Sequence, residues 1–170
     1  MVAATRDCRE GPASSGRKTL VLGLGNPLLT DDGVGLQVVQ RLRPTLAGCT
    51  GVEVGEDFCG GLRLMERMIG FDRAIIVDAI CSGAAPGTVR TLAVDDLPTR
   101  HSGSAHDADM GAALALGRQG GAALPAGDDI RIVAIEAEDV LTFGEECTPR
   151  VRASIPHAAE VVLAILAAWR

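Results

Sequence analysis

Two aspartates and one histidine, Asp32, Asp78 and His106, stand out as residues whose type and position could serve chemistry. Asp32 follows a short apolar run and a turn rich in Gly, Asn and Pro, and Gly33 beside it removes side-chain bulk. Asp78 interrupts a continuous apolar run, where an ionised carboxylate is costly unless it is paired, hydrogen-bonded or bound to a metal. These two carboxylates are therefore candidates for chemistry.

His106 lies near the start of an expected helix, which Ser104 and Asp107 introduce as a capping box. The positive end of a helix disfavours the imidazolium, so a neutral ring is available there as a ligand or a base. Two carboxylates and an imidazole make an O, O, N donor set that suits Ni, Zn or Mn. The three residues predict a metal-contacting and catalytic site if their segments converge.

Each candidate also has a structural interpretation. Asp32 or its neighbour Asp31 could simply cap the helix that follows. Asp78 could be held by a buried hydrogen bond to nearby loop amides. A single histidine is more often structural than functional, and His101 and His157 have less support from their surroundings than the histidine at position 106.

The elements that must position these residues alternate between strand and helix. Five apolar segments are expected to be strands: 20–24, 51–56, 73–80, 88–93 and 130–136. Four segments are expected to contain helices: 35–42, 58–68, 104–117 and the stretch after Thr148-Pro149, where Pro156 should kink or restart the helix. This alternation predicts a three-layer α/β/α sandwich of a single domain (19–170) after a disordered tail (1–18).

Composition narrows the class of protein. The chain has 170 residues, a net charge of −6, and 47% hydrophobic but only 2% aromatic residues, which suits a Val/Ile-rich sheet covered by Ala/Leu helices. An acidic chain lacks the basic face that nucleic acid or an anionic membrane requires. We find no apolar run near the roughly 18 residues of a membrane span. Five cysteines without a C-x-x-C pair indicate a reduced, cytoplasmic protein.

Three competing motifs receive little support. Residues 23–28 begin like a dinucleotide fingerprint, and Glu56 could supply its acid, but Leu28 occupies the third glycine position. The chain contains no G-x-x-x-x-G-K-[ST] phosphate loop. A nucleophilic pair of Cys81 and His106 is conceivable without any local signature to support it. An oxidoreductase domain that binds a dinucleotide remains the less favoured alternative.

Four stretches resemble the hydrogenase maturation proteases, and the similarity runs in the order of that family from residue 20 to 166. They read VLGLGNPLLTDDGVG, FDRAIIVDAICSGAAPGTV, SAHDADM and TFGEECTPRVRASIPHAAEVVLAIL. The family comprises endopeptidases that trim the C-terminus of the large subunit of NiFe hydrogenases. The resemblance implies an α/β/α sandwich around a twisted, five-stranded, mostly parallel sheet of the phosphorylase/hydrolase-like kind.

The resemblance also assigns roles to the three candidates. It implies that Asp32, Asp78 and His106 contact nickel that the substrate precursor carries, so that cleavage follows nickel insertion. It implies an aspartyl-type peptidase with no organic cofactor, whose partner is the large-subunit precursor and which acts as a monomer. A chaperone that checks nickel without cutting is an alternative from another class.

The chain departs from the family pattern in two places. Many members carry D-G-G after the second strand, whereas this chain reads EDFCGG at 56–61. Asp32 stands where some relatives have Glu. The stretch GLGNP also resembles peptidyl-tRNA hydrolases, but the His-Asn pair that follows in that family is absent here.

Overall fold

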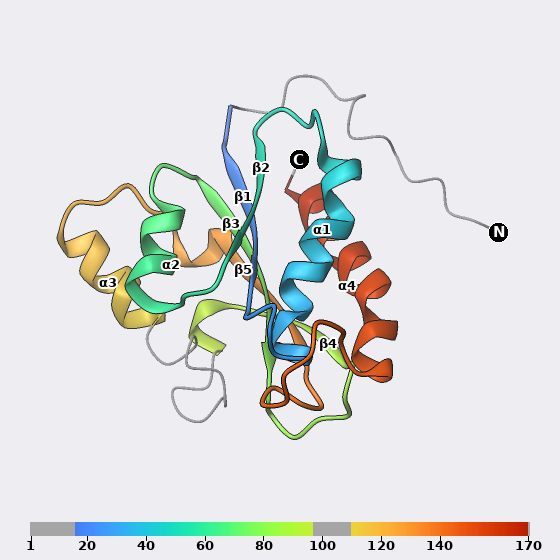
Figure 1. Cartoon of the computed structure of the whole chain (residues 1–170). Helices are drawn as coiled ribbons and strands as arrows, with labels where there is room; N and C mark the ends of the chain where they lie inside the picture. Colours follow the sequence, from blue (N-terminus) through green and yellow to red (C-terminus); the bar gives the residue numbers. More distant parts are fainter. Residues whose placement is uncertain (1–15, 97–109, 170) are drawn as a thin grey trace.

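Five strands form one twisted sheet in the order β2-β1-β3-β5-β4 in the computed structural model, which describes residues 16–96 and 110–169 (Figure 1). The strands are β1 Thr19–Leu24, β2 Val52–Asp57, β3 Arg73–Ile80, β4 Val89–Leu92 and β5 Ile130–Glu136. The first four in spatial order are parallel, and β4 pairs antiparallel with β5 at one edge. The expected strands are confirmed to within one residue at each end, and the sheet is mostly parallel as predicted.

Two helices cover each face of the sheet (Figure 1). The α1/α4 layer contains α1 Val34–Leu46 and α4 Pro149–Ala168, and the α2/α3 layer contains α2 Gly61–Met68 and α3 Met110–Gln119. Short 3-10 turns lie at η1 Asp31–Gly33, η2 Val94–Asp96 and η3 Gly127–Asp129. The three-layer α/β/α prediction is confirmed. The predicted capping box at 104–107 lies outside the described residues.

The central strand β3 divides its side chains between the two layers. Ile75, Val77 and Ala79 belong to the core beneath α1 and α4, whereas Ala74, Ile76 and Ile80 belong to the core beneath α2 and α3. Since successive strand residues point to opposite faces, the even-numbered position 78 faces the α2/α3 layer. The sequence period therefore determines the layer in which the Asp78 carboxylate lies.

Glycines let α1 begin directly against β1 and β3. Gly23 is paired with Val77, and a Cβ atom at Gly35 would lie 2.3 Å from the Val77 carbonyl oxygen. Gly25 has φ +134°, and a Cβ atom there would lie 1.8 Å from the carbonyl oxygen of Asp32. A Cβ atom at Gly23 would lie 2.4 Å from the carbonyl oxygen of Gly35 in α1, so close backbone packing accounts for both glycines that resembled a dinucleotide fingerprint.

The last helix, α4, is long and apolar enough to cross a membrane. By length and composition alone, the expectation that no segment approaches a membrane span was therefore wrong. In this fold, however, its buried hydrophobic side chains join the core shared with α1; they are Val151, Ile155, Ala158, Ala159, Val162 and Leu166. The helix continues through Pro156 as one element rather than restarting there.

Candidate active site

Asp32 and Asp78 lie at the same edge of the sheet, where the parallel strands β1 and β3 end. Asp32 is in η1, directly after the β1 loop, and η1 contacts β3. Asp78 follows the last residue of β3 that pairs with β1. Both side chains are buried, with 5% and 2% of their surface exposed. Open α/β sheets bind ligands at this edge, and the structure brings these two carboxylates to it. His106 lies outside the described residues.

The Asp32 carboxylate organises the loop that carries it. Its Oδ2 atom accepts the backbone N–H of Asn26 at 2.7 Å, and the Asn26 side chain in turn accepts the N–H of Leu28 at 3.0 Å. The helix cap that we considered from the sequence is wrong, because Gly33 is the N-cap of α1 and no side chain caps it. The carboxylate instead reaches back across its own loop.

Asp78 has a local hydrogen bond, since its Oδ1 atom accepts the N–H of Ala79 at 2.8 Å. The sequence alternative of a buried hydrogen bond is therefore present, although this donor belongs to the strand and not to a loop. Such a bond orients a carboxylate in its strand and is compatible with either a structural or a chemical role.

Asp31 is a structural clamp. It is fully buried, and its two oxygens accept four hydrogen bonds of 2.7–3.0 Å, all from the segment that joins β5 to α4. The donors are the backbone N–H groups of Glu138, Asp139 and Thr148 and the hydroxyl of Thr148. Thr148 is the N-cap of α4, but its hydroxyl donates to Asp31 rather than capping the helix. We assign Asp31 to holding the two loops together and not to the reaction.

Glu136 is a second structural clamp, which the sequence analysis missed. Its Oε1 atom accepts three successive backbone N–H groups, Ser82, Gly83 and Ala84, at 2.7–3.2 Å. Its Oε2 atom accepts the Ser82 hydroxyl at 2.7 Å and the Arg90 guanidinium at 3.3 Å. The side chain is only 2% exposed, so these donors compensate for its burial.

Asp57, at the end of β2, was missed in the same way. It is 4% exposed, accepts the N–H groups of Phe58 and Cys59, and lies 3.3 and 3.6 Å from Arg63 and Arg67 of α2. Asp78 was identified because it interrupts an apolar strand, whereas Glu136 and Asp57 are the last residues of their strands. Their position at the strand end was the available signal, although both turn out to be occupied by donors from neighbouring loops and helices.

Within residues 16–96 and 110–169 no three His, Cys, Asp or Glu side chains are grouped so that they could hold a metal ion. Asp32 and Asp78 therefore do not form a metal site by themselves within the described residues. His106 is the candidate third donor that the sequence offers. Carboxylate oxygens with an imidazole nitrogen remain a chemically reasonable set for nickel.

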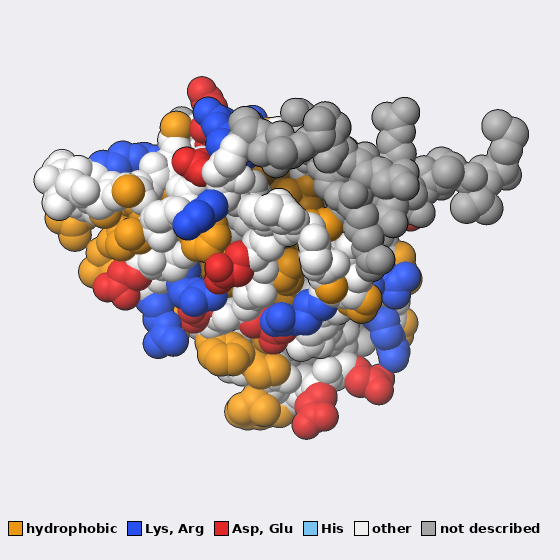
Figure 2. Space-filling view, turned by 90° about the horizontal axis from the view of Figure 1, so that it is seen from above, with side chains coloured by type: hydrophobic (Ala, Val, Ile, Leu, Met, Phe, Trp, Pro, Cys, Tyr) orange, Lys and Arg blue, Asp and Glu red, His pale blue; other side chains and the backbone are white. Residues whose placement is uncertain are grey.

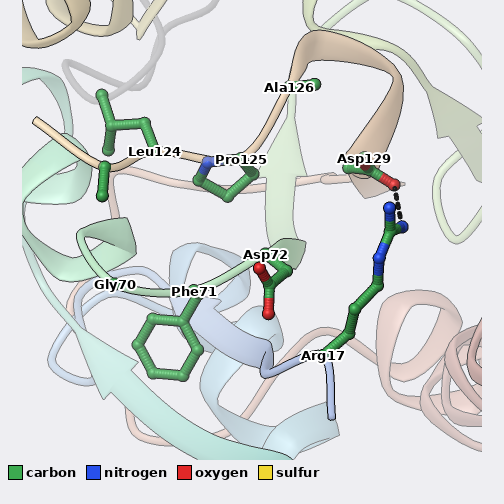
Figure 3. Close-up of a pocket in the computed structure, with 9 residues that line it drawn as sticks. Arg17, Gly70, Phe71, Asp72, Leu124, Pro125, Ala126 and Asp129 are labelled. Carbon is green, nitrogen blue, oxygen red and sulfur yellow. Dashed lines mark ion pairs between the residues drawn. The ribbon is translucent and has the colours of Figure 1, made fainter. Parts of the chain in front are cut away.

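A cavity of about 300 Å³ lies at the opposite edge of the sheet, beside the segments that enter β1, β3 and β5 (Figure 3). Arg17, Phe71, Asp72 and Leu124 contribute to its wall, and Arg17 pairs with Asp129 at 3.5 Å. Figure 2 looks onto this end of the molecule and shows acidic and basic side chains interspersed on its described part. The cavity is thus separate from the edge that carries Asp32 and Asp78.

A family model described as hydrogenase maturation protease (HycI) matches residues 37–165, so the chain belongs to the hydrogenase maturation protease family. The protein is accordingly a peptide hydrolase of hydrogenase maturation.

Individual relatives agree with this assignment. The chain is 34% identical to the hydrogenase 2 maturation protease of Escherichia coli over 152 residues, which cover 88% of this chain and 90% of that protein. It is 31% identical to the hydrogenase expression/formation protein HoxM of Azotobacter vinelandii, covering 87% and 72% of the two chains.

Solved structures show the same fold. The hydrogenase-maturating endopeptidase HybD of E. coli superposes with a TM-score of 0.75 at 33% identity, covering 88% of this chain and 91% of that one. The NiFe hydrogenase maturation protease HybD of Thermococcus kodakarensis gives a TM-score of 0.64 at 27% identity, covering 87% and 98%.

Proposed function

We propose that the protein removes a C-terminal extension from a NiFe hydrogenase large-subunit precursor after nickel has been inserted. The observation that carries this proposal is the pair of buried carboxylates, Asp32 and Asp78, which two different elements bring to the ligand-binding edge of the sheet. In a maturation protease, such a pair suits the recognition of a metal ion that arrives with the substrate.

In this proposal the precursor presents its nickel to Asp32, Asp78 and His106, and the protein needs no metal or organic cofactor of its own. These side chains orient the scissile peptide bond, and one of the two carboxylates takes a proton from the attacking water. Water adds to the carbonyl carbon, the C–N bond breaks, and the nitrogen of the released peptide receives the proton. Asp31 does not take this role, because four donors occupy its oxygens.

The experiment compares cleavage of a nickel-loaded and a nickel-free precursor by the native protein and by three variants, Asp32→Asn, Asp78→Asn and His106→Ala. We expect peptide release from the loaded precursor only, and a loss of about 100-fold in rate for each variant, as for removal of an acid–base group. His157→Ala is the matched control, because His157 is exposed on α4 and pairs only loosely with Glu160 at 3.9 Å.

Other outcomes contradict parts of the proposal. Equal cleavage of loaded and nickel-free precursor would remove the nickel dependence. Binding of the precursor by the native protein without any cut would favour the chaperone that only checks nickel. Cytoplasmic location and the monomeric state are further proposals, which fractionation and sedimentation of the native protein test.

A further inference from the structure

Three large hydrophobic side chains stand exposed at the same edge of the sheet as the candidate site. Leu28, in the β1 loop, is 57% exposed, and Leu141 and Phe143, in the segment between β5 and α4, are 81% and 82% exposed. We call these three residues the apolar rim. Their sequence signal was available, since two large hydrophobic residues interrupt a polar, acidic connection that contains no regular element.

Backbone pairing joins the two loops that form the apolar rim. The Gly144 N–H donates to the Leu28 carbonyl at 3.0 Å, and the Thr30 N–H donates to the Thr142 carbonyl at 3.1 Å. Leu29 and Phe143 form an isolated antiparallel bridge between these bonds. Phe143 therefore lies opposite Leu29, and Leu28 is the residue before Leu29, bonded to Gly144, in a small two-stranded contact.

A turn fixes the remaining part of the apolar rim. The Asp139 carboxylate accepts the N–H groups of Leu141 and Thr142, both at 2.9 Å. The hydroxyl of Thr142, followed by these two N–H groups, lowers the pKa of Asp139 below its ordinary value. The carboxylate thus stays ionised at neutral pH and holds the turn, while the Asp31 clamp secures both ends of the segment. The apolar rim is preorganised before any partner binds.

The apolar rim is continuous with the candidate site through one short chain of contacts. Asp32 accepts the Asn26 N–H, and Asn26 accepts the Leu28 N–H. A partner that delivers a metal to Asp32 therefore lies next to Leu28. Around the apolar rim, the acids Glu138 and Glu145 are exposed, whereas Glu146 is paired with Arg152 at 2.9 Å.

We propose that the apolar rim is the docking surface for the folded body of the large-subunit precursor, which inserts these side chains into an apolar hollow bordered by Lys or Arg. This inference rests on the proposed function. Side chains that are more than 80% exposed protrude, and only a concave, folded surface can bury them on several sides. The surrounding acids favour a basic border on that surface. The apolar rim thus determines which precursor is bound, and Asp32 and Asp78 act at the cut.

The test uses the double variant Leu141→Gln/Phe143→Gln. Its matched control is Ile69→Gln/Leu116→Gln, which removes two hydrophobic side chains that are 46% and 56% exposed and lie away from this edge. Equilibrium binding of the precursor to each immobilised protein is measured first, followed by KM and kcat for cleavage. Thermal unfolding of each variant verifies that it is folded.

We expect the rim variant to weaken binding and to raise KM by roughly tenfold or more, as for loss of an interface hot spot, with kcat within about twofold. The control should bind like the native protein. Added salt should weaken native binding, because the acidic border contributes to it.

Three results overturn the inference. Unchanged binding of the precursor by the rim variant removes the docking role, even if the native protein cuts as proposed. If the native protein sediments as a dimer and the rim variant sediments as a monomer, the surface binds a second copy of this chain instead. If the native protein neither binds nor cuts the precursor, the proposed function and the docking surface fail together. If the native protein and the rim variant cut the precursor equally well, only the docking surface fails.

Discussion

Asp31 and Asp32 are consecutive and both buried, yet they belong to two regions that treat a carboxylate differently. In the clamp region, Asp31 accepts four hydrogen bonds from the segment between β5 and α4. In the edge region, Asp32 accepts the Asn26 N–H, beside the end of β3 that carries Asp78. Burial alone does not distinguish the two, since their exposed fractions are 0% and 5%.

The difference shows how to separate a structural acid from a reactive one. A carboxylate whose lone pairs are filled by donors from a distant segment joins two parts of the fold, and protonating or binding metal there would require breaking those bonds. Glu136 belongs with Asp31 on this criterion, because it binds three successive amides and a guanidinium. The chemistry is therefore expected in the edge region.

The largest effect is expected for Asp31→Ala. The change leaves buried N–H groups of Glu138, Asp139 and Thr148 without their acceptor, so we expect a loss of about 3–5 kcal/mol in the free energy of unfolding, as for breaking a buried charged network. Urea denaturation measures it. Asp128→Ala, an exposed acid in η3, should change the stability by less than about 0.5 kcal/mol. A similar small loss at Asp31 would mean that the clamp is not structural.

The reverse pattern is expected for Asp32→Asn. The amide oxygen can still accept the Asn26 N–H, so unfolding should shift little, whereas cleavage should fall by about 100-fold, equivalent to roughly 2.7 kcal/mol in the barrier. Parallel rate measurements and denaturation curves give both numbers. A variant that unfolds without a specific loss of rate would place Asp32 in the clamp region and remove the contrast between the two neighbours.

A smaller effect is expected for Glu136→Gln. The amide oxygen can retain the Ser82–Ala84 amides, but the attraction to Arg90 is lost, so we expect a destabilisation of about 1–2 kcal/mol. A double-mutant cycle with Arg90→Gln should give a coupling energy of about 0.5–1 kcal/mol, because the two groups touch and Arg90 is partly exposed. Zero coupling would mean that the three amides and the Ser82 hydroxyl, rather than Arg90, account for the acid at this position.

The fold was predictable because its signals are local and repeated. The run at Arg73–Ile80 is apolar on both faces, and both of its ends were predicted correctly. A strand buried on both sides gives a continuous apolar run, whose limits are easier to locate than those of a strand with alternating polar residues. The antiparallel direction of β4 was not predictable. Its direction depends on how the chain returns from the turn at Ala85-Pro86-Gly87, which short-range propensity does not encode.

The site was predictable only in part. Asp78 was found because an acid in an apolar strand is conspicuous, and the structure confirms that it is buried. The separate roles of Asp31 and Asp32 were not predictable, because the four donors to Asp31 come from residues more than 100 positions away in the chain. The assignment of His106 remains a prediction from the sequence and the resemblance.

The smallest effect concerns the pH dependence that the clamp region imposes on Cys147. Burial of the thiol, followed by repulsion from the Asp31 carboxylate, raises the pKa of Cys147 from 9.0 to about 11, against the opposing attraction of Arg152. Because the folded pKa lies above the unfolded value, the folded state favours the neutral thiol. This contribution to stability is complete below about pH 9 and is lost as the pH rises toward 11.

We therefore expect the unfolding free energy of the native protein to fall more steeply than that of Cys147→Ser between pH 9 and pH 11. Urea denaturation at several pH values in this window measures the difference. Asp31→Asn, which removes the charge and keeps one acceptor oxygen, should lower the pKa of Cys147 and move the extra loss of stability to a lower pH. If the native protein and the Cys147→Ser variant lose stability in parallel, the Asp31 carboxylate does not raise the pKa of the thiol. The electrostatic part of the contrast between Asp31 and Asp32 would then be wrong, whereas the hydrogen-bonding part would be unaffected.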